Sequence, residues 1–194
     1  MMKTKKANLQ LFQADMYRLL ANCFDFPTKE RLSTIKEITE GLSQIGYPDM
    51  EIANILVTLN EAFDESEIIN DYSLIFIKGG VPLNESYTLQ KFNSVSDVSA
   101  FYKAFGFSPK TGENPDSIMY QLEFLALLLV KINTAPNEEA KEITEKAYRS
   151  FLEEHCGEFA LSLAKRIREG NAGTYYFTVS YLLESLITQE LITK

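Results

Sequence analysis

Apolar residues recur every three or four positions along most of this chain, which is the period of an α-helix with one buried face. The pattern predicts helices over residues 7–23, 28–45, 49–63, 66–78, 97–105, 115–132, 138–155, 158–169 and from 174 onward. No strand-like runs joined by a hairpin turn interrupt it, and strands do not alternate with helices. We therefore predict an all-α fold, a single helical domain of roughly eight to ten helices.

The most informative helix start lies at residues 114–116. Asn114 is a good N-cap, Pro115 suits the first helical position, and Asp116 faces the positive end of the helix dipole. The apolar positions that follow form a broad face: Ile118, Met119, Leu122, Leu125, Ala126, Leu128, Leu129 and Ile132. A face of this width predicts a central, well-buried helix.

Residues 78–86 form the most loop-like stretch of the chain, and residues 108–112 form a second loop. Gly79 and Gly80 are not preceded by a strand or followed by the Lys-Ser/Thr pair of a phosphate-binding loop. They therefore indicate a turn and give no support for a nucleotide site.

The chain has 194 residues, of which 45% are hydrophobic, enough for one domain with a substantial core. Its formal charge is −8, although Lys3, Lys5 and Lys6 lie in the first six residues. We predict a flexible basic tail over residues 1–7 and a helical domain over residues 8–194. An acidic domain argues against nucleic acid and anionic membranes as partners and favours a cationic peptide or protein. The alternative is that the acids serve solubility alone.

Candidate chemistry is sparse. Cys23 and Cys156 lie far apart in apolar helical segments, and His155 is the single histidine, so a zinc or iron–sulfur site lacks ligands. We predict two buried free thiols, no cofactor, no metal and no catalytic residue, with His155 capping or packing near a helix end. With no secretory signal and no apolar run long enough to span a membrane, we expect a cytoplasmic protein.

Four stretches of the sequence carry a family resemblance. In order, they are Asp71–Ile77 leading to Pro82 and Glu85-Ser86, then Asp97–Phe107, then Pro115-Asp116 through Leu125, and finally Phe151–His155 followed by Phe159. Together they resemble the TorD/DmsD/NarJ family of redox-enzyme maturation chaperones. The chain departs from the family pattern where Ser117 replaces a histidine, Gln121 replaces an acid and Phe159 replaces a tryptophan.

The resemblance implies a client-specific chaperone without catalytic activity. Members of this family bind the N-terminal leader or the body of a molybdoenzyme catalytic subunit and hold it in the cytoplasm until its molybdenum cofactor is inserted. The subunit is then released for twin-arginine export or membrane assembly. The alternative is a helical adaptor or assembly factor that binds a folded subunit without recognising a leader. We expect either a monomer or a dimer that exchanges a segment through a hinge at residues 108–114.

A leader offers arginines and an apolar segment, so we expect an apolar groove with acids at one end. The candidate peptide-binding residues come from one helical face, the following loop and the matched motifs: Tyr72, Ile75, Phe76, Pro82, Leu83, Glu85, Ser86, Tyr87, Pro115, Asp116, Ser117 and Glu123. The candidate acidic patch for the leader arginines is Glu65, Glu67 and Asp71.

Each candidate also has a plainer interpretation. The triplet Tyr72, Ile75 and Phe76 has the spacing of an ordinary core face, and a run of acids is usually a solvated surface. Asp116 is explained as a partner of the helix dipole, and Glu123 as a carboxylate at the flank of an apolar stripe. The sequence alone leaves these alternatives open.

Overall fold

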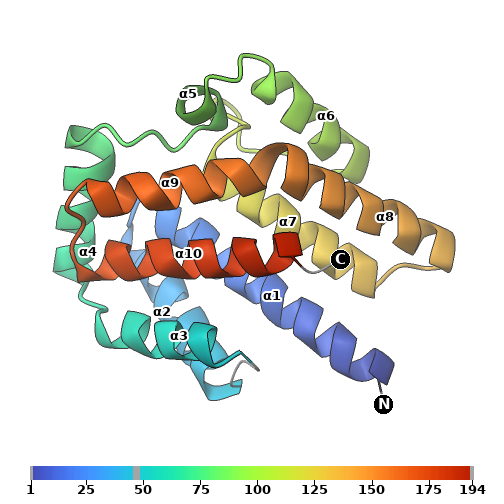
Figure 1. The fold of residues 1–194 in the computed structure, drawn as a ribbon, viewed down its shortest axis with the longest axis horizontal. Coiled ribbons are helices and arrows are strands. Elements are labelled where there is room, and N and C mark those ends of the chain that lie inside the picture. The colour runs from blue at the N-terminus through green and yellow to red at the C-terminus, as the bar shows by residue number, and fades with distance from the viewer. Residues whose placement is uncertain (1, 46–48, 193–194) are drawn as a thin grey trace.

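In a computed structural model of the chain, residues 2–45 and 49–192 are described, and they form one all-helical domain (Figure 1). This part of the chain contains ten α-helices and two π-helical segments, and its only extended pairing is a single bridge between Asn84 and Ser117. The elements are α1 Met2–Phe24, α2 Lys29–Ile45, α3 Met50–Glu61, α4 Glu65–Tyr72, η1 Ser73–Lys78, α5 Glu85–Leu89, α6 Ser94–Phe105, α7 Ile118–Asn133, α8 Glu138–Phe151, η2 Leu152–Cys156, α9 Gly157–Glu169 and α10 Thr174–Ile192. The predicted all-α class is confirmed.

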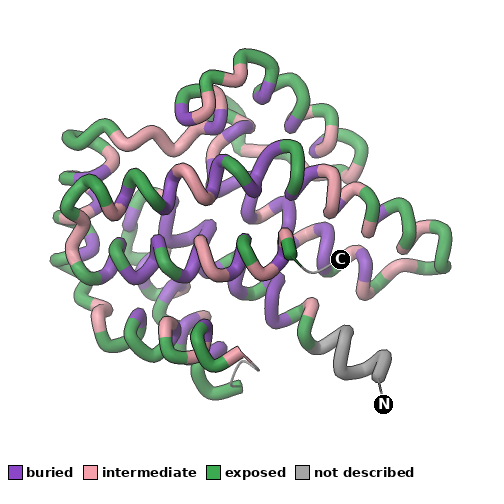
Figure 2. Tube along the Cα trace, viewed as in Figure 1, coloured by how far each residue is buried: buried purple, intermediate pink, exposed green. Residues whose placement is uncertain are grey.

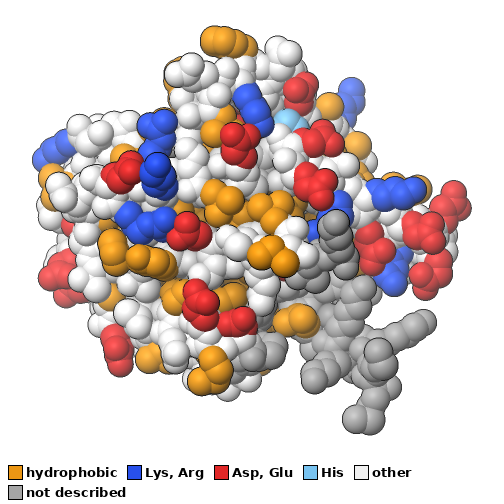
Figure 3. All heavy atoms as spheres, viewed as in Figure 1, with side chains coloured by type: hydrophobic (Ala, Val, Ile, Leu, Met, Phe, Trp, Pro, Cys, Tyr) orange, Lys and Arg blue, Asp and Glu red, His pale blue; other side chains and the backbone are white. Residues whose placement is uncertain are grey.

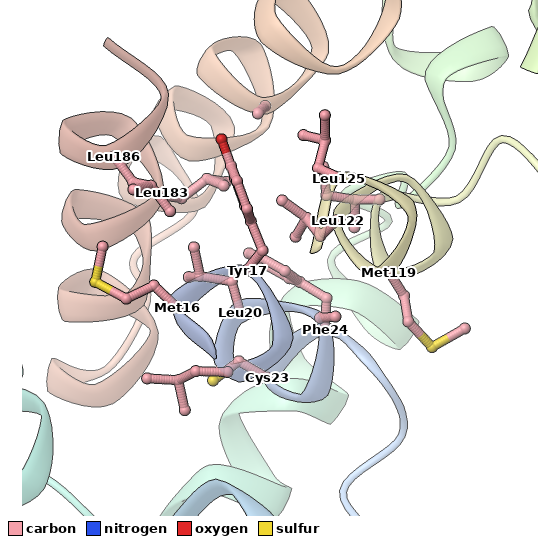
Figure 4. Packing of buried hydrophobic residues seen from close by; sticks show 14 of the residues in the cluster. Met16, Tyr17, Leu20, Cys23, Phe24, Met119, Leu122, Leu125, Leu183 and Leu186 are labelled. Carbon is pink, nitrogen blue, oxygen red and sulfur yellow. The ribbon is translucent and has the colours of Figure 1, made fainter. Parts of the chain in front are cut away.

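Helix α1 runs through the centre of the molecule and packs chiefly against α7, with α2 beside it. Helices α9 and α10 lie side by side, and α10 also packs on α3 (Figure 1). Figure 4 shows Leu20 and Phe24 of α1 lying between Leu186 of α10 and Leu122 of α7. Burying one large apolar side chain contributes about 1.5–3 kcal/mol, so this shared core holds the helices together.

Helix α7 is buried on nearly every side, as its broad apolar face predicts. Eleven of its 16 residues are buried, among them Phe124 and Leu125 at no measurable exposure. In Figure 2 the buried parts of the chain concentrate where α1, α7 and α10 approach one another. The prediction of a central helix is confirmed.

The start of α7 differs from the prediction. The helix begins at Ile118, and Ser117 caps it by accepting a hydrogen bond from the Tyr120 N–H at 3.5 Å. Asn114 instead accepts a main-chain hydrogen bond from Ser117 at 3.3 Å, within a turn. The predicted N-cap at Asn114 is wrong because residues 114–117 form a turn before the helix, so Pro115 and Asp116 also precede it. The Asp116 carboxylate binds the loop before α5 instead.

Two predicted helices contain wider π-helical turns near their ends. The predicted helix 66–78 is α4 followed by η1, and the predicted helix 138–155 is α8 followed by η2. A Cβ at Gly79 would lie 2.6 Å from the Leu74 carbonyl oxygen, and one at Gly157 would lie 2.7 Å from that of Leu152. Glycine is therefore the residue that fits after each segment. The backbone of Gly157 is right-handed helical, and α9 follows η2 directly.

Helix α5 and the first residues of α1 lie where the sequence predicted no helix. Helix α5 lies at the end of a stretch expected to be loop, and its five residues carry no periodic pattern. Helix α1 includes residues 2–7, which the sequence analysis assigned to a flexible tail, and both that flexibility and the boundary at residue 8 stay predictions. Residues 1, 46–48, 193 and 194 lie outside the described part of the chain.

The predicted buried thiols are confirmed, because Cys23 and Cys156 are free and almost fully buried. Burial raises the pKa of the Cys23 thiol to about 12 and also raises the pKa of the Cys156 thiol, so neither is a reactive thiolate at neutral pH. Among the described residues, every helix is too short or too polar to cross a membrane.

Candidate functional site

The sequence stretches that carry the family resemblance meet at the start of α7. They contribute Glu85, Asp116, Gln121 and His155, which we call the motif cluster. Hydrogen bonds link the four residues, and none of them is more than 6% exposed. Residues as far as 70 positions apart in the sequence thus form one buried polar unit.

Asp116 joins the loop before α5 to the start of α7. Its carboxylate accepts hydrogen bonds from the Ser86 N–H at 2.8 Å and from the Asn84 side-chain amide at 3.2 Å. Its main-chain carbonyl accepts a third from the Glu85 N–H at 3.0 Å. These three hydrogen bonds to one residue fix the loop against the start of α7.

Glu85 is a fully buried carboxylate surrounded by donors. The side-chain amide of Gln121 donates to it at 2.8 Å, Nδ1 of His155 lies 3.3 Å away, and the Lys91 ammonium lies 3.7 Å away. A buried carboxylate without such partners would be costly to fold around. The glutamate of the first motif and the histidine of the fourth therefore have a structural reason to occur together.

Gln121 explains one departure from the family pattern. Its amide nitrogen donates to Glu85 and to the Asp116 carbonyl, while its side-chain oxygen has no partner among the described residues. An acid at this position would place a second carboxyl group beside Glu85 in a buried site. Glutamine at position 121 instead donates a hydrogen bond to Glu85.

Burial revises the role predicted for two candidates. Glu85 and Asp116 have no exposed surface, so a peptide cannot touch either side chain in this structure. Their hydrogen bonds position the loop that carries Pro82 and Leu83 instead. We therefore treat both as positioning residues for any ligand that this loop contacts.

The predicted apolar triplet belongs mostly to the core. Tyr72 and Ile75 are 8% and 3% exposed, and only Phe76 is half-buried. The Phe76 ring lies 5.0 Å from that of Tyr72 and 5.3 Å from that of Tyr176. The plainer interpretation thus fits Tyr72 and Ile75. The exposed apolar residues of this segment are Leu74 and Ile77, which the sequence analysis did not select.

Two of the more exposed candidates, Leu83 and Ser117, line a small hollow at the start of α7, which we call the entry pocket. Pro82, Leu83, Ser86, Pro115 and Ser117 are all half-buried along this loop contact, and Tyr87 is exposed. The entry pocket has a volume of about 240 Å3 and is lined by Phe24, Asp25, Leu83, Asn84, Glu113, Asn114, Ser117, Ile118, Met119 and Tyr120. It brings together Leu83 and Ser117, which lie 34 positions apart.

Sequence reasoning missed the two acids of the entry pocket, Asp25 and Glu113. Each stands alone in a connecting segment, where acids are usually solvated, so no pattern marks it. Phe24 and Met119 were also missed, because their periodicity is that of ordinary core residues. The last residue of α1 and the first turn of α7 come together only in the folded chain.

The predicted acidic patch is divided in the structure. Glu65 and Glu67 are exposed on the first turn of α4, while Asp71 turns toward the connection between α9 and α10. There Asp71 accepts a hydrogen bond from the Gly173 N–H, and partial burial raises its pKa. A Cβ at Gly173 would lie 2.7 Å from the Asp71 carboxyl carbon. Asp71 therefore anchors α4 to the start of α10.

Glu123, the last candidate, is half-buried on α7, outside the entry pocket. It lines a second hollow together with residues of α1 and α2. Burial raises the pKa of the Glu123 carboxyl above its usual value.

Comparison with known proteins adds one finding. The sequence model of the nitrate reductase delta subunit family matches residues 47–165, which is more than half of the chain and includes the whole motif cluster. A search of curated proteins found no match. The match agrees with the resemblance seen in the four sequence stretches and with the all-helical fold. The chain therefore belongs to the nitrate reductase delta subunit family, whose members are non-catalytic chaperones of redox-enzyme maturation.

Proposed function

We propose that this chaperone binds the N-terminal leader of a molybdoenzyme catalytic subunit of the nitrate reductase type. It would hold the subunit in the cytoplasm while the molybdenum cofactor is inserted, and then release it for twin-arginine export or membrane assembly. The chaperone itself supplies no chemistry to the reaction of its client. It recognises the leader of the subunit and delays export until the cofactor is in place.

The entry pocket is the observation that carries this proposal. Its apolar wall includes Phe24, Leu83 and Met119. Its two acids are Asp25, which pairs with Arg31, and Glu113, which accepts a hydrogen bond from the Tyr120 hydroxyl. A leader places basic residues beside an apolar segment, so both parts find complementary surface here. The loop that forms one wall is held by the motif cluster, which keeps Leu83 in place before the peptide arrives.

The segment that leads to this loop and the residue after Ser86 also expose apolar side chains. Leu74 and Ile77 of η1 are 47% and 61% exposed, and Tyr87 beyond the loop is 71% exposed. Micromolar binding needs about 8 kcal/mol. Burial of a few hundred Å2 of apolar surface supplies that gross amount at about 25 cal/mol per Å2, before the entropy cost of association is subtracted.

The test is affinity capture of the tagged chaperone from anaerobically grown native cells, with and without the leader of the captured subunit. We expect a molybdoenzyme catalytic subunit to be recovered, and recovery to fail when its leader is deleted. The Leu83→Glu variant should lose the subunit. The matched control Phe92→Glu should retain it, because Phe92 is 93% exposed and outside the entry pocket.

The other outcomes separate the alternatives. Recovery of the subunit regardless of its leader would favour the adaptor function, in which the chaperone docks on the body of the client. Failure to recover any redox subunit across several growth conditions would overturn both. Size-exclusion chromatography with light scattering on the same sample tests the predicted monomer against the segment-exchanged dimer.

A further inference from the structure

The second hollow lies further along the same face of α7 as the entry pocket. Tyr120 lines the entry pocket, while Glu123, Leu127 and Val130 line the second hollow, which has a volume of about 520 Å3. These positions are three or four residues apart, so they lie on one side of the helix over successive turns. We call the second hollow the Glu123 pocket.

Most of the Glu123 pocket is apolar. Ile38 of α2, Phe107 of the loop after α6, and Leu127 and Val130 of α7 contribute hydrocarbon surface. The polar part of its lining comes from Arg18, Asn22, Arg31, Thr34 and Glu123. The Arg31 side chain pairs with Asp25 of the entry pocket, so the two hollows meet at this ion pair.

Within the described part of the chain, the carboxylate of Glu123 has no hydrogen bond and no ion pair. The nearest cations do not neutralise it by contact. The Arg31 guanidinium donates to Asp25 and, at 2.6 Å, to the side-chain oxygen of Asn22. The Arg18 side chain is 64% exposed and pairs with Asp15 at 3.8 Å.

A half-buried anion without a direct partner is an energetic cost that a ligand can remove. Desolvation raises the pKa of Glu123, and the charges of Arg31, Lys110 and Arg18 offset this only in part. A cation placed in the pocket would recover the lost solvation through charge-assisted hydrogen bonds. Among cations, a guanidinium suits a partly desolvated site best, because it is weakly hydrated and binds a carboxylate through two parallel hydrogen bonds.

We propose that Glu123 binds an arginine side chain of the client leader, with the neighbouring apolar residues of the leader lying on Leu127, Val130 and Ile38. This inference rests on the proposed leader-binding function and assigns one contact within it. The leader would then follow α7 from the Glu123 pocket to the entry pocket, and the two hollows would act as one groove.

The acids on α4 are the competing site for the same arginine. Glu65 and Glu67 are exposed, and exposed ion pairs contribute little because water and salt screen them. Glu123 combines a carboxylate with adjacent apolar surface, which is the combination that an arginine beside an apolar segment presents. The geometry therefore favours the pocket over the exposed turn.

A double-mutant cycle with the full chain tests this assignment. The probes are two synthetic leaders, each with an arginine pair followed by a leucine-rich segment, of which one carries citrulline at both arginines. Citrulline keeps the shape of arginine without its charge. Affinities are measured by titration calorimetry for the wild type, Glu123→Gln and the matched control Glu65→Gln, after thermal melts establish that each variant folds.

We expect Glu123→Gln to weaken binding of the arginine leader about tenfold, which is the usual scale of one charge-assisted hydrogen bond. Its affinity for the citrulline leader should equal that of the wild type, and Glu65→Gln should change neither. Equal losses for both leaders, or a loss confined to Glu65→Gln, would overturn the Glu123 assignment and leave leader binding intact. Failure of the wild type to bind either leader would overturn the proposed function together with this contact.

Discussion

Glu190 lies almost wholly inside the molecule, where α1, α8 and α10 meet. The Tyr148 hydroxyl donates to one of its carboxylate oxygens at 2.6 Å, and the Gln13 side-chain amide donates to the other. Tyr17 extends the chain of hydrogen bonds through the Tyr148 hydroxyl at 3.0 Å. Burial still outweighs these donors and the nearby Arg149, so the pKa of Glu190 lies above its usual value.

This raised pKa makes the stability of the protein depend on pH in a definite direction. Between the unfolded pKa of about 4.3 and the higher folded value, the folded state holds more protons, so the free energy of unfolding falls as pH rises. Each unit of pKa difference contributes about 1.4 kcal/mol. We expect Glu190→Gln to remove this term, so its stability relative to the wild type should increase as pH rises through this window and then stay constant.

Urea unfolding of both proteins at a series of pH values between about 4 and 8 gives the comparison directly. Asp71 and Glu123, whose pKa values are also raised by burial, are present in both proteins and cancel in the difference. A difference in stability that does not vary with pH would contradict the prediction.

Single residues show clearly where sequence reasoning succeeds. Cys23 and Cys156 lie in segments with an apolar helical pattern, and this pattern alone predicts their burial. The fate of Asp71 depends on a glycine 102 positions later, and no local pattern contains that partner. Tyr72 has the same spacing whether it faces a groove or a core, so the sequence leaves both interpretations open.

The loop before α5 depends on one side chain for its attachment to α7. Removing the Asp116 carboxylate by Asp116→Ala would leave the Ser86 N–H and the Asn84 amide without their acceptor. The cost of such a loss is about 1–3 kcal/mol. We expect hydrogen exchange of the amides in residues 83–88 to accelerate by about tenfold or more, and leader affinity to fall because Leu83 is no longer held in place.

A matched control comes from another capping aspartate. Asp64 accepts hydrogen bonds from the N–H groups of Ser66 and Glu67 at the start of α4, at 2.9 and 3.0 Å. Asp64→Ala should accelerate exchange within α4 and leave residues 83–88 protected. If Asp116→Ala lowered leader affinity with no change in exchange, Asp116 would have to contact the leader directly, against its complete burial.

At the level of elements, prediction succeeded where caps and periodicity agreed. Thr28 caps α2 and Gly106 ends α6 in a left-handed conformation, both at predicted boundaries. Prediction failed where tertiary bonds override local preference, as at the start of α7, where Asp116 serves the loop. The entry pocket and the Glu123 pocket could not be predicted at all, because each is built from segments that meet only after folding.

The molecule as a whole carries a formal charge of −8, and the acids are spread over several elements. In Figure 3 acidic side chains gather over α8, while hydrophobic side chains follow the seam between α9 and α10. Such a field attracts a cationic leader from a distance and does not select the place where it binds. Selection requires short-range contacts, which the entry pocket and the Glu123 pocket offer.

The long-range electrostatic attraction and the short-range contacts can be distinguished by binding kinetics, because the first acts mainly on the association rate and the second on the dissociation rate. Raising the salt concentration from about 0.1 M to about 1 M shortens the screening length from about 10 Å to about 3 Å. We expect the association rate of the arginine leader to fall about tenfold over this range, and that of the citrulline leader to fall far less. Glu123→Gln removes one charge from a large total, so its association rate should keep most of this salt dependence while its dissociation rate rises. Stopped-flow fluorescence with both leaders measures the association and dissociation rates of the wild type and of Glu123→Gln. An unchanged dissociation rate, with the whole loss in association, would mean that Glu123 contributes to the long-range field alone and that the arginine is bound elsewhere.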